Sequence, residues 1–126
     1  MSKNEVIWVV VNTHSVKEAD KIGKAVLKKR LCACYGIMPR IKSVYYWPPK
    51  TGKLEVSKGP LLTLETLEKN YGKIVKLVKS LHTDQVPFIG QWEMENVQPD
   101  FYKWLKKDVK SIYIFDNKIL NCRFSI

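Results

Sequence analysis

Hydrophobic positions in this chain alternate between strand-like runs and helix-like stripes. Residues 6–11 form a continuous apolar run rich in β-branched side chains, which predicts a strand buried on both faces. Ser15 stands three positions before Glu18, the spacing of a capping box, which predicts a helix that runs to about residue 30. A second helix is expected from a cap at Thr66 to about Leu81, because apolar residues recur there at spacings of three and four.

Two strands joined by a long hairpin are expected between these helices. The first covers residues 32–37 and resumes at 41–47 after an interruption at Pro39, whose missing amide donor favours an edge or a bulge. The second covers residues 54–66. The segment 48–53 between them contains two prolines and a glycine, which stop ladder bonding and predict an exposed tip.

A fourth strand and a third helix complete the pattern. The strand runs from Pro87 to Met94, and the helix begins at Pro99, a residue suited to the first helical turn. The order β-α-β-β-α-β predicts an α+β, ferredoxin-like fold, in which both main helices lie on one face of an antiparallel sheet and a C-terminal helix follows. The run 6–11 makes the other face apolar, so we expect another copy of the chain to cover it.

Length and composition favour a single domain, residues 1–126. The chain is 45% hydrophobic and contains no repeat, low-complexity stretch or Gly/Ser/Pro linker. No run approaches the ~20 apolar residues that span a bilayer, and residues 1–5 are polar rather than signal-like. We therefore expect a cytoplasmic protein with no membrane partner.

The formal charge of +10 makes an acidic partner one alternative. Lysines line the outer stripes of both main helices, as they would in a nucleic-acid-binding module on a ferredoxin-like fold. A solvated helix face explains the same stripes. Residues 61–66 also lack the glycine- and aromatic-rich pattern of an RNA-recognition strand, so nucleic acid is the alternative partner rather than the expected one.

The cysteines offer one candidate chemistry. Cys32, Cys34 and Cys122 make an odd number in a chain of ordinary size, which favours reduced thiols over a disulfide framework. Cys32 and Cys34 stand two apart on a predicted strand, so we expect their side chains to share a face about 7 Å apart, too far to bridge easily. Two thiolates there could hold a soft ion such as Cu(I) with ligands from neighbouring subunits, whereas burial as small hydrophobes is the simpler alternative.

His82 is the third candidate ligand. It follows the second predicted helix, where an imidazole also suits a capping or loop role. His14 and His82 are far from any cysteine in the sequence, so their spacing does not support a zinc site. The chain contains no phosphate-binding glycine loop, nucleophile elbow or closely spaced acid pair, and we expect neither enzymatic activity nor a required cofactor.

Six segments resemble the CutA divalent-cation tolerance family, which the chain follows from about residue 6 to residue 106. They are 30–37 (RLCACYGI), 43–47 (SVYYW), 52–55 (GKLE), 62–66 (LTLET), 81–87 (LHTDQVP) and 100–105 (DFYKWL). Cys34 stands at the family's cysteine position. The chain departs from the family pattern at Gly36, where asparagine is usual, at Glu65, where lysine is usual, and after His82, where proline, tyrosine and glutamate are missing. Residues 110–126 fall outside the resemblance.

The resemblance implies a ferredoxin-like subunit in a tight homotrimer, with sheet packed on sheet and the long hairpin reaching a neighbour. The family is similar in architecture to PII signalling proteins, is linked to tolerance of divalent metals, copper above all, and has no settled enzymatic activity. We therefore expect a homotrimer that takes part in divalent metal tolerance or response, with copper or a small ligand at clefts between subunits. Cys34, Cys32 and His82 are the candidate copper ligands.

Overall fold

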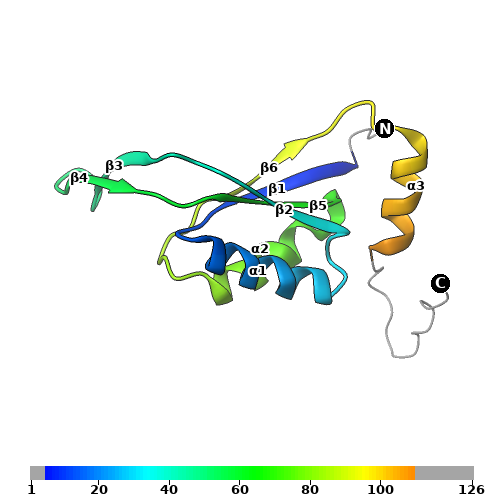
Figure 1. The fold of residues 1–126 in the computed structure, drawn as a ribbon, viewed down its shortest axis with the longest axis horizontal. Coiled ribbons are helices and arrows are strands. Elements are labelled where there is room, and N and C mark those ends of the chain that lie inside the picture. Colours follow the sequence, from blue (N-terminus) through cyan, green and yellow to red (C-terminus); the bar gives the residue numbers. More distant parts are fainter. Residues whose placement is uncertain (1–4, 110–126) are drawn as a thin grey trace.

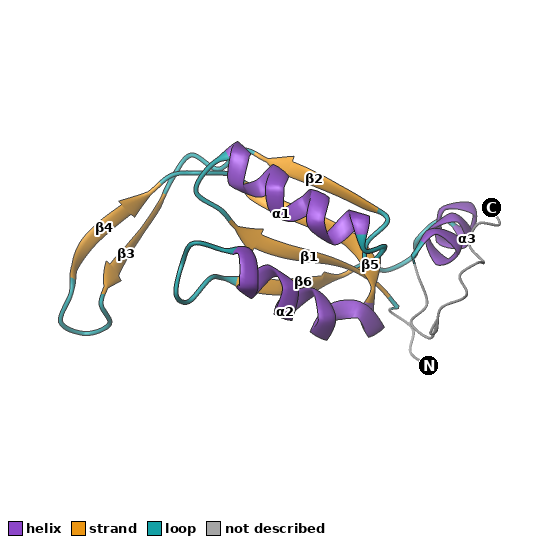
Figure 2. Ribbon diagram, turned by 90° about the horizontal axis from the view of Figure 1, so that it is seen from below, coloured by secondary structure: helices purple, strands orange, loops and turns teal. Residues whose placement is uncertain are grey.

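Four antiparallel strands form the central sheet of the structure, a computed structural model that describes residues 5–109. They are β1 (Val6–Asn12), β2 (Cys34–Met38), β5 (Leu61–Leu67) and β6 (Ile89–Glu93), in the order β2-β5-β1-β6. Helices α1 (Val16–Lys28) and α2 (Tyr71–Leu81) lie side by side on one face of this sheet (Figure 1, Figure 2). The arrangement confirms the ferredoxin-like α+β fold predicted from the sequence.

The main core lies between the sheet and these two helices. Along β1, Ile7, Val9 and Val11 face the helices and are completely buried. Full burial of one such side chain stabilises a fold by about 1.5–3 kcal/mol, so this layer fixes the helices to the sheet. The other fully buried residues of the layer are Ala19, Ile22, Val26, Cys32, Leu62, Leu64, Ile74 and Val78.

The opposite sheet face is open over most of its area in the described part of the chain (Figure 1). One row across it consists of Cys34, Glu65, Trp8 and Trp92, each on a different strand. The rings of Trp8 and Trp92 stack with their centroids 6.5 Å apart, and Trp92 keeps 47% of its surface exposed. This face therefore carries two large aromatic side chains and is only partly covered by residues 5–109 of one copy.

A third helix, α3 (Pro99–Asp108), covers one end of the open face. Its Leu105 and the following Val109 are buried against Val6 and Leu67. The helix begins with Pro99, as predicted, and the Gln98 side chain accepts a hydrogen bond from an amide in its first turn.

Strands β3 (Ser43–Trp47) and β4 (Lys53–Ser57) form a separate two-stranded hairpin that projects from the other end of the molecule (Figure 1). The predicted continuous strand 54–66 is wrong, because β4 and β5 are separated by residues 58–60. Gly59 has a φ of +140°, and a Cβ there would lie 2.3 Å from the Thr13 carbonyl oxygen. Pro60 has no amide donor, so pairing stops on this side of the hairpin as well as at Pro39.

The start of α2 also differs from the prediction. Thr66 belongs to β5, and its hydroxyl donates to the Leu31 carbonyl at 2.5 Å instead of capping a helix. The pairing of β1 with β5 extends to Leu67, so the strand continues past the expected cap. A 3-10 turn, Glu68–Asn70, follows, and α2 begins at Tyr71 without a side-chain cap.

The capping box predicted at the start of α1 is present. The Ser15 hydroxyl accepts a hydrogen bond from the Glu18 amide at 3.0 Å, and the Glu18 carboxylate accepts one from the His14 amide at 2.8 Å. The same carboxylate accepts hydrogen bonds from the amide and the hydroxyl of Thr83, both at 3.0 Å. Burial raises the Glu18 pKa, but these hydrogen bonds outweigh burial and hold the pKa below its ordinary value of 4.5. Glu18 therefore fastens the loop after α2 to the start of α1.

Gly23 lets α1 approach β2 closely. A Cβ at this position would lie 2.5–2.8 Å from three ring atoms of Tyr35. The Tyr35 ring is held in place by its hydroxyl, which donates to the Asp20 carboxylate at 2.5 Å. The helix and the strand therefore meet where only a glycine leaves room for the tyrosine.

We expect Glu18→Gln to lower the free energy of unfolding by about 1–3 kcal/mol at neutral pH, because hydrogen bonds to a charged acceptor are weakened. A lowered native pKa adds stability above the unfolded pKa of 4.5, and this stability is lost as the pH falls through the native value. Urea unfolding measures this free energy at both pH values. The difference between the wild type and Glu18→Gln should be smaller near pH 3 than at neutral pH. Glu95→Gln is the control, because it makes the same change of charge at an exposed residue. If Glu18→Gln lowered the free energy of unfolding equally at both pH values, the role of Glu18 would be contradicted.

We expect Gly23→Ala to destabilise the fold by about 1–3 kcal/mol through overpacking against Tyr35, although alanine is the better helix former. Gly72→Ala is the matched control, because a Cβ at Gly72 meets nothing within 4 Å. That second variant should be neutral or more stable by up to about 1 kcal/mol. Thermal unfolding measures both, and equal melting temperatures for the two variants would refute the tight contact.

Candidate functional site

The two cysteines that the structure describes lie on different sides of the sheet, so the prediction that they share a face is wrong. β2 begins at Cys34, which leaves Cys32 before the strand and outside its alternation. Cys32 is fully buried in the core on the helix side. Cys34 is exposed on the open face, opposite Glu65. Cys122, the third cysteine, lies outside the described residues.

Both thiols are hard to ionise. Burial raises the pKa of Cys32 to about 12. Burial, and then the negative charge of Glu65, raise the pKa of Cys34. A metal ion that binds Cys34 must therefore displace its proton, which makes binding tighter as the pH rises.

His82 is a structural residue at the end of α2. Its amide donates to the Val78 carbonyl at 2.9 Å, and its side chain is completely buried. Its Nε2 atom lies 2.6 Å from the Asn12 carbonyl oxygen, and its Nδ1 atom lies 3.0 Å from the Asp84 amide nitrogen. Because a carbonyl only accepts and an amide N–H only donates, the network assigns the proton to Nε2. Both ring nitrogens are thus engaged in holding the loop after α2.

The predicted copper ligands are not brought together within one chain. Cys34 lies level with Trp8 on β1, whereas His82 bonds to Asn12, four residues or about 13 Å further along that strand. Across residues 5–109, no group of three or more His, Cys, Asp or Glu side chains is placed to hold a metal ion. Copper binding by Cys32, Cys34 and His82 stays a prediction.

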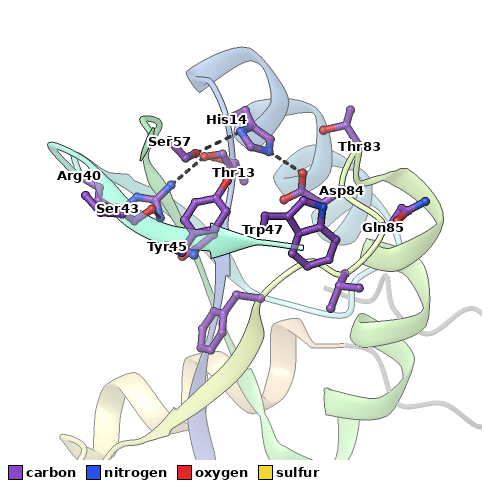
Figure 3. A pocket seen from close by; sticks show the side chains of 14 residues that line it. Thr13, His14, Arg40, Ser43, Tyr45, Trp47, Ser57, Thr83, Asp84 and Gln85 are labelled. Atoms are coloured by element: carbon purple, nitrogen blue, oxygen red, sulfur yellow. Dashed lines mark hydrogen bonds and ion pairs between the residues drawn. The ribbon is translucent and has the colours of Figure 1, made fainter. Parts of the chain in front are cut away.

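A groove of about 600 Å³ lies at the base of the hairpin, between the end of β1, strand β3 and the loop after α2. Side chains alternate along a strand, so Ser43, Tyr45 and Trp47 project from one face of β3 into this groove (Figure 3). The loop contributes Thr83 and Asp84. The groove therefore combines an aromatic wall with several polar groups.

His14 connects two sides of the groove (Figure 3). Its Nε2 atom lies 2.7 Å from the Asp84 carboxylate, and its Nδ1 atom lies 3.5 Å from the Ser57 hydroxyl. Because a carboxylate only accepts, Nε2 carries a proton. The sequence does not indicate this cluster, since its members are far apart along the chain. The capping box beside His14 is the one local signal that marks its position.

Arg40 holds the hairpin to the rest of the molecule. Its Nε atom donates to the Gly59 carbonyl at 2.8 Å, and its Nη2 atom donates to the Thr13 carbonyl at 3.1 Å. Its Nη1 atom lies 3.3 Å from the Ser43 hydroxyl. All three acceptors are neutral, and no carboxylate of residues 5–109 forms an ion pair with Arg40. Sequence reasoning missed this residue, because nothing marks it except its place after Pro39.

The lysines of the two main helices are exposed, as predicted for a solvated face. Lys17, Lys21, Lys24 and Lys28 lie along α1, and Lys73, Lys76 and Lys79 lie along α2. Of these, Lys24 forms an ion pair with Asp20 at 3.3 Å. Binding of nucleic acid by this surface stays an untested prediction. None of the described helices is long and apolar enough to cross a membrane.

Comparison with known proteins gives one family. The model of the CutA1 divalent ion tolerance protein family matches residues 7–108. The divalent-cation tolerance protein CutA of Pyrococcus horikoshii is 32% identical over 94 residues, which cover 75% of this chain and 88% of that protein. The CutA protein of Archaeoglobus fulgidus is 28% identical over 103 residues, which cover 82% of this chain and 97% of that protein.

The fold agrees with this match. The solved structure of the Archaeoglobus fulgidus protein, which is described as periplasmic, superposes with a TM-score of 0.77 at 28% identity. The superposition covers 83% of this chain and 99% of that one. Together, the match of residues 7–108 and the shared fold show that the chain belongs to the CutA1 divalent ion tolerance protein family.

Proposed function

We propose that the protein acts as a homotrimer in divalent metal tolerance, with the open sheet face and the β3–β4 hairpin as its subunit interfaces. One observation carries this proposal: the face of the two-stranded hairpin opposite Tyr45 and Trp47 consists of large apolar side chains, all of them exposed. A two-stranded hairpin is marginally stable alone, and exposed apolar patches of this kind mark interaction sites. The residues of this face are Val44, Tyr46, Leu54 and Val56.

The partner proposed for these surfaces is another copy of the chain. The open sheet face also carries exposed apolar side chains, Trp92 and Met38, and is proposed as an interface for the same reason. The number of copies, three, rests on the family resemblance, whereas the apolar surfaces support only that there is more than one copy.

Light scattering should give a mass about three times the 14.7 kDa of the chain. Tyr46 and Leu54 are cross-strand neighbours on one face of the hairpin, so we expect the double variant Tyr46→Lys, Leu54→Lys to dissociate the assembly. Val16→Lys is the control, because it places a charge on an equally exposed apolar residue at the start of α1. A wild-type monomer at micromolar concentration, or dissociation by the control as well, would refute these interfaces.

We further propose that the metal of this tolerance function is copper, bound as Cu(I) through Cys34 with further ligands from neighbouring copies. Two observations support Cys34 over the other candidates. Its thiol is exposed on the open face, whereas Cys32 is enclosed in the core. The ring nitrogens of His82 already hold the loop after α2. Cysteine sulfur is a soft ligand that favours Cu(I) over harder ions.

An anaerobic Cu(I) titration of the wild type and of Cys34→Ser tests this proposal. We expect Cys34→Ser to weaken binding by more than about tenfold, and Cys32→Ser to leave it nearly unchanged. Since the raised pKa of Cys34 keeps the thiol protonated, wild-type affinity should increase as the pH rises. Equal affinities for the wild type and Cys34→Ser would end the copper proposal and leave the trimer proposal intact.

The protein is proposed to act in the cytoplasm and without catalysis. The odd number of cysteines, which favours reduced thiols, and the absence of enzyme motifs in the sequence support these two points.

A further inference from the structure

Arg40 places a positive charge at the groove at the base of the hairpin, and no acidic side chain of residues 5–109 forms an ion pair with it. It is only partly exposed, and its three hydrogen bonds go to two carbonyls and one hydroxyl. A guanidinium has five N–H donors, so two of them remain for another acceptor. An arginine that is already fixed in position loses little side-chain freedom when it binds a planar anion.

The acidic group of the groove does not compensate this charge through an ion pair. Asp84 also lines the groove, but its carboxylate is bound to His14 at 2.7 Å. In Figure 3, Arg40 lies on one side of the aromatic residues and Asp84 on the other. The end of the groove at Arg40 therefore favours a negative group.

The aromatic wall suits a flat apolar group beside that anion. Tyr45 and Trp47 share one face of β3, and Phe88 follows the loop after α2. The three side chains are 41%, 44% and 54% exposed, so their rings are accessible from the groove. Aromatic rings stack on one another in offset or edge-to-face geometry, and each pair adds about 0.5–1.5 kcal/mol.

We propose that this groove binds a small organic anion that carries a planar ring, with its carboxylate or phosphate group on Arg40 and its ring against Tyr45, Trp47 and Phe88. Arg40 is the residue that selects the charge, through the donors that its structural bonds leave free. The aromatic wall selects the ring. The proposal goes beyond metal tolerance and does not depend on it, because none of these residues is a proposed copper ligand.

Calorimetric titration of the full chain in metal-free buffer tests the proposal with four probes. Phenyl phosphate and benzoate carry both a ring and a charge, inorganic phosphate lacks the ring, and benzyl alcohol lacks the charge. We expect at least one of the first two to bind more than about tenfold tighter than either of the others. The affinities of phenyl phosphate and benzoate then show whether the groove prefers a phosphate or a carboxylate. No binding of either ring-bearing anion at about 10 mM would overturn the proposal.

Two pairs of variants assign the roles. Arg40→Gln should weaken binding of the ring-bearing anion by at least about tenfold, whereas Arg30→Gln should leave it unchanged. Arg30 is an exposed arginine that pairs with Asp108 on α3, so the control changes the net charge equally but away from the groove. An equal loss in both variants would mean general charge attraction and would refute the site.

Arg40 also anchors the hairpin, so Arg40→Gln removes structural hydrogen bonds as well as a charge. A second variant therefore tests the groove with the hydrogen bonds of Arg40 in place. Tyr45→Leu removes a ring from the groove and none of the hydrogen bonds of Arg40. This variant should weaken the binding of phenyl phosphate or benzoate by at least about threefold and leave the binding of inorganic phosphate unchanged. If Tyr45→Leu binds all probes like the wild type, the aromatic part of the proposal fails.

Discussion

Burial of β1 on both of its faces is the constraint on which the rest of this structure depends. Ile7, Val9 and Val11 are removed from water by α1 and α2, and this contact fixes the position of both helices. On the other side, Val6 and Val10 are also nearly buried, while the Trp8 ring is covered only in part. The strand therefore needs a cover that one copy of the chain does not complete in its described residues. The proposed assembly rests on the same six residues that organise the core.

The hairpin shows how a break in the sheet creates a site. Pro39 on one side and Gly59 with Pro60 on the other stop the ladder, so β3 and β4 leave the central sheet as an independent pair. The groove lies where they leave it, and the Arg40 guanidinium bridges the break by bonding to Gly59, Thr13 and Ser43. The same bonds that stabilise the bend hold a cation beside an aromatic wall.

Local patterns in the sequence were sufficient to predict the elements and their order, and long-range contacts decided the rest. The apolar run 6–11 and the capping box at Ser15 act within a few residues, so both were visible in the sequence. Thr66 was misread as a cap because its competing hydrogen bond goes to Leu31, 35 residues away. Cys32 and Cys34 were misplaced for a similar reason, since the first residue of β2 depends on its pairing with β5. Arg40 is marked only by its place after Pro39, and the capping box marks His14 but not its contact with Asp84, which lies 70 residues away.

The loop after α2 contains one residue that the fold needs and others that set the chemistry of the groove. His82, kept from the family pattern, is buried with both ring nitrogens engaged, so the end of α2 depends on it. Thr83 and Asp84, which differ from that pattern, bond instead to Glu18 and His14 at the start of α1. The loop is thus held by the same framework while its exposed side chains change the chemistry of the groove. Replacement of Thr83 and Asp84 would leave the buried bonds of His82 in place, because the groove chemistry is set by side chains that the core does not need.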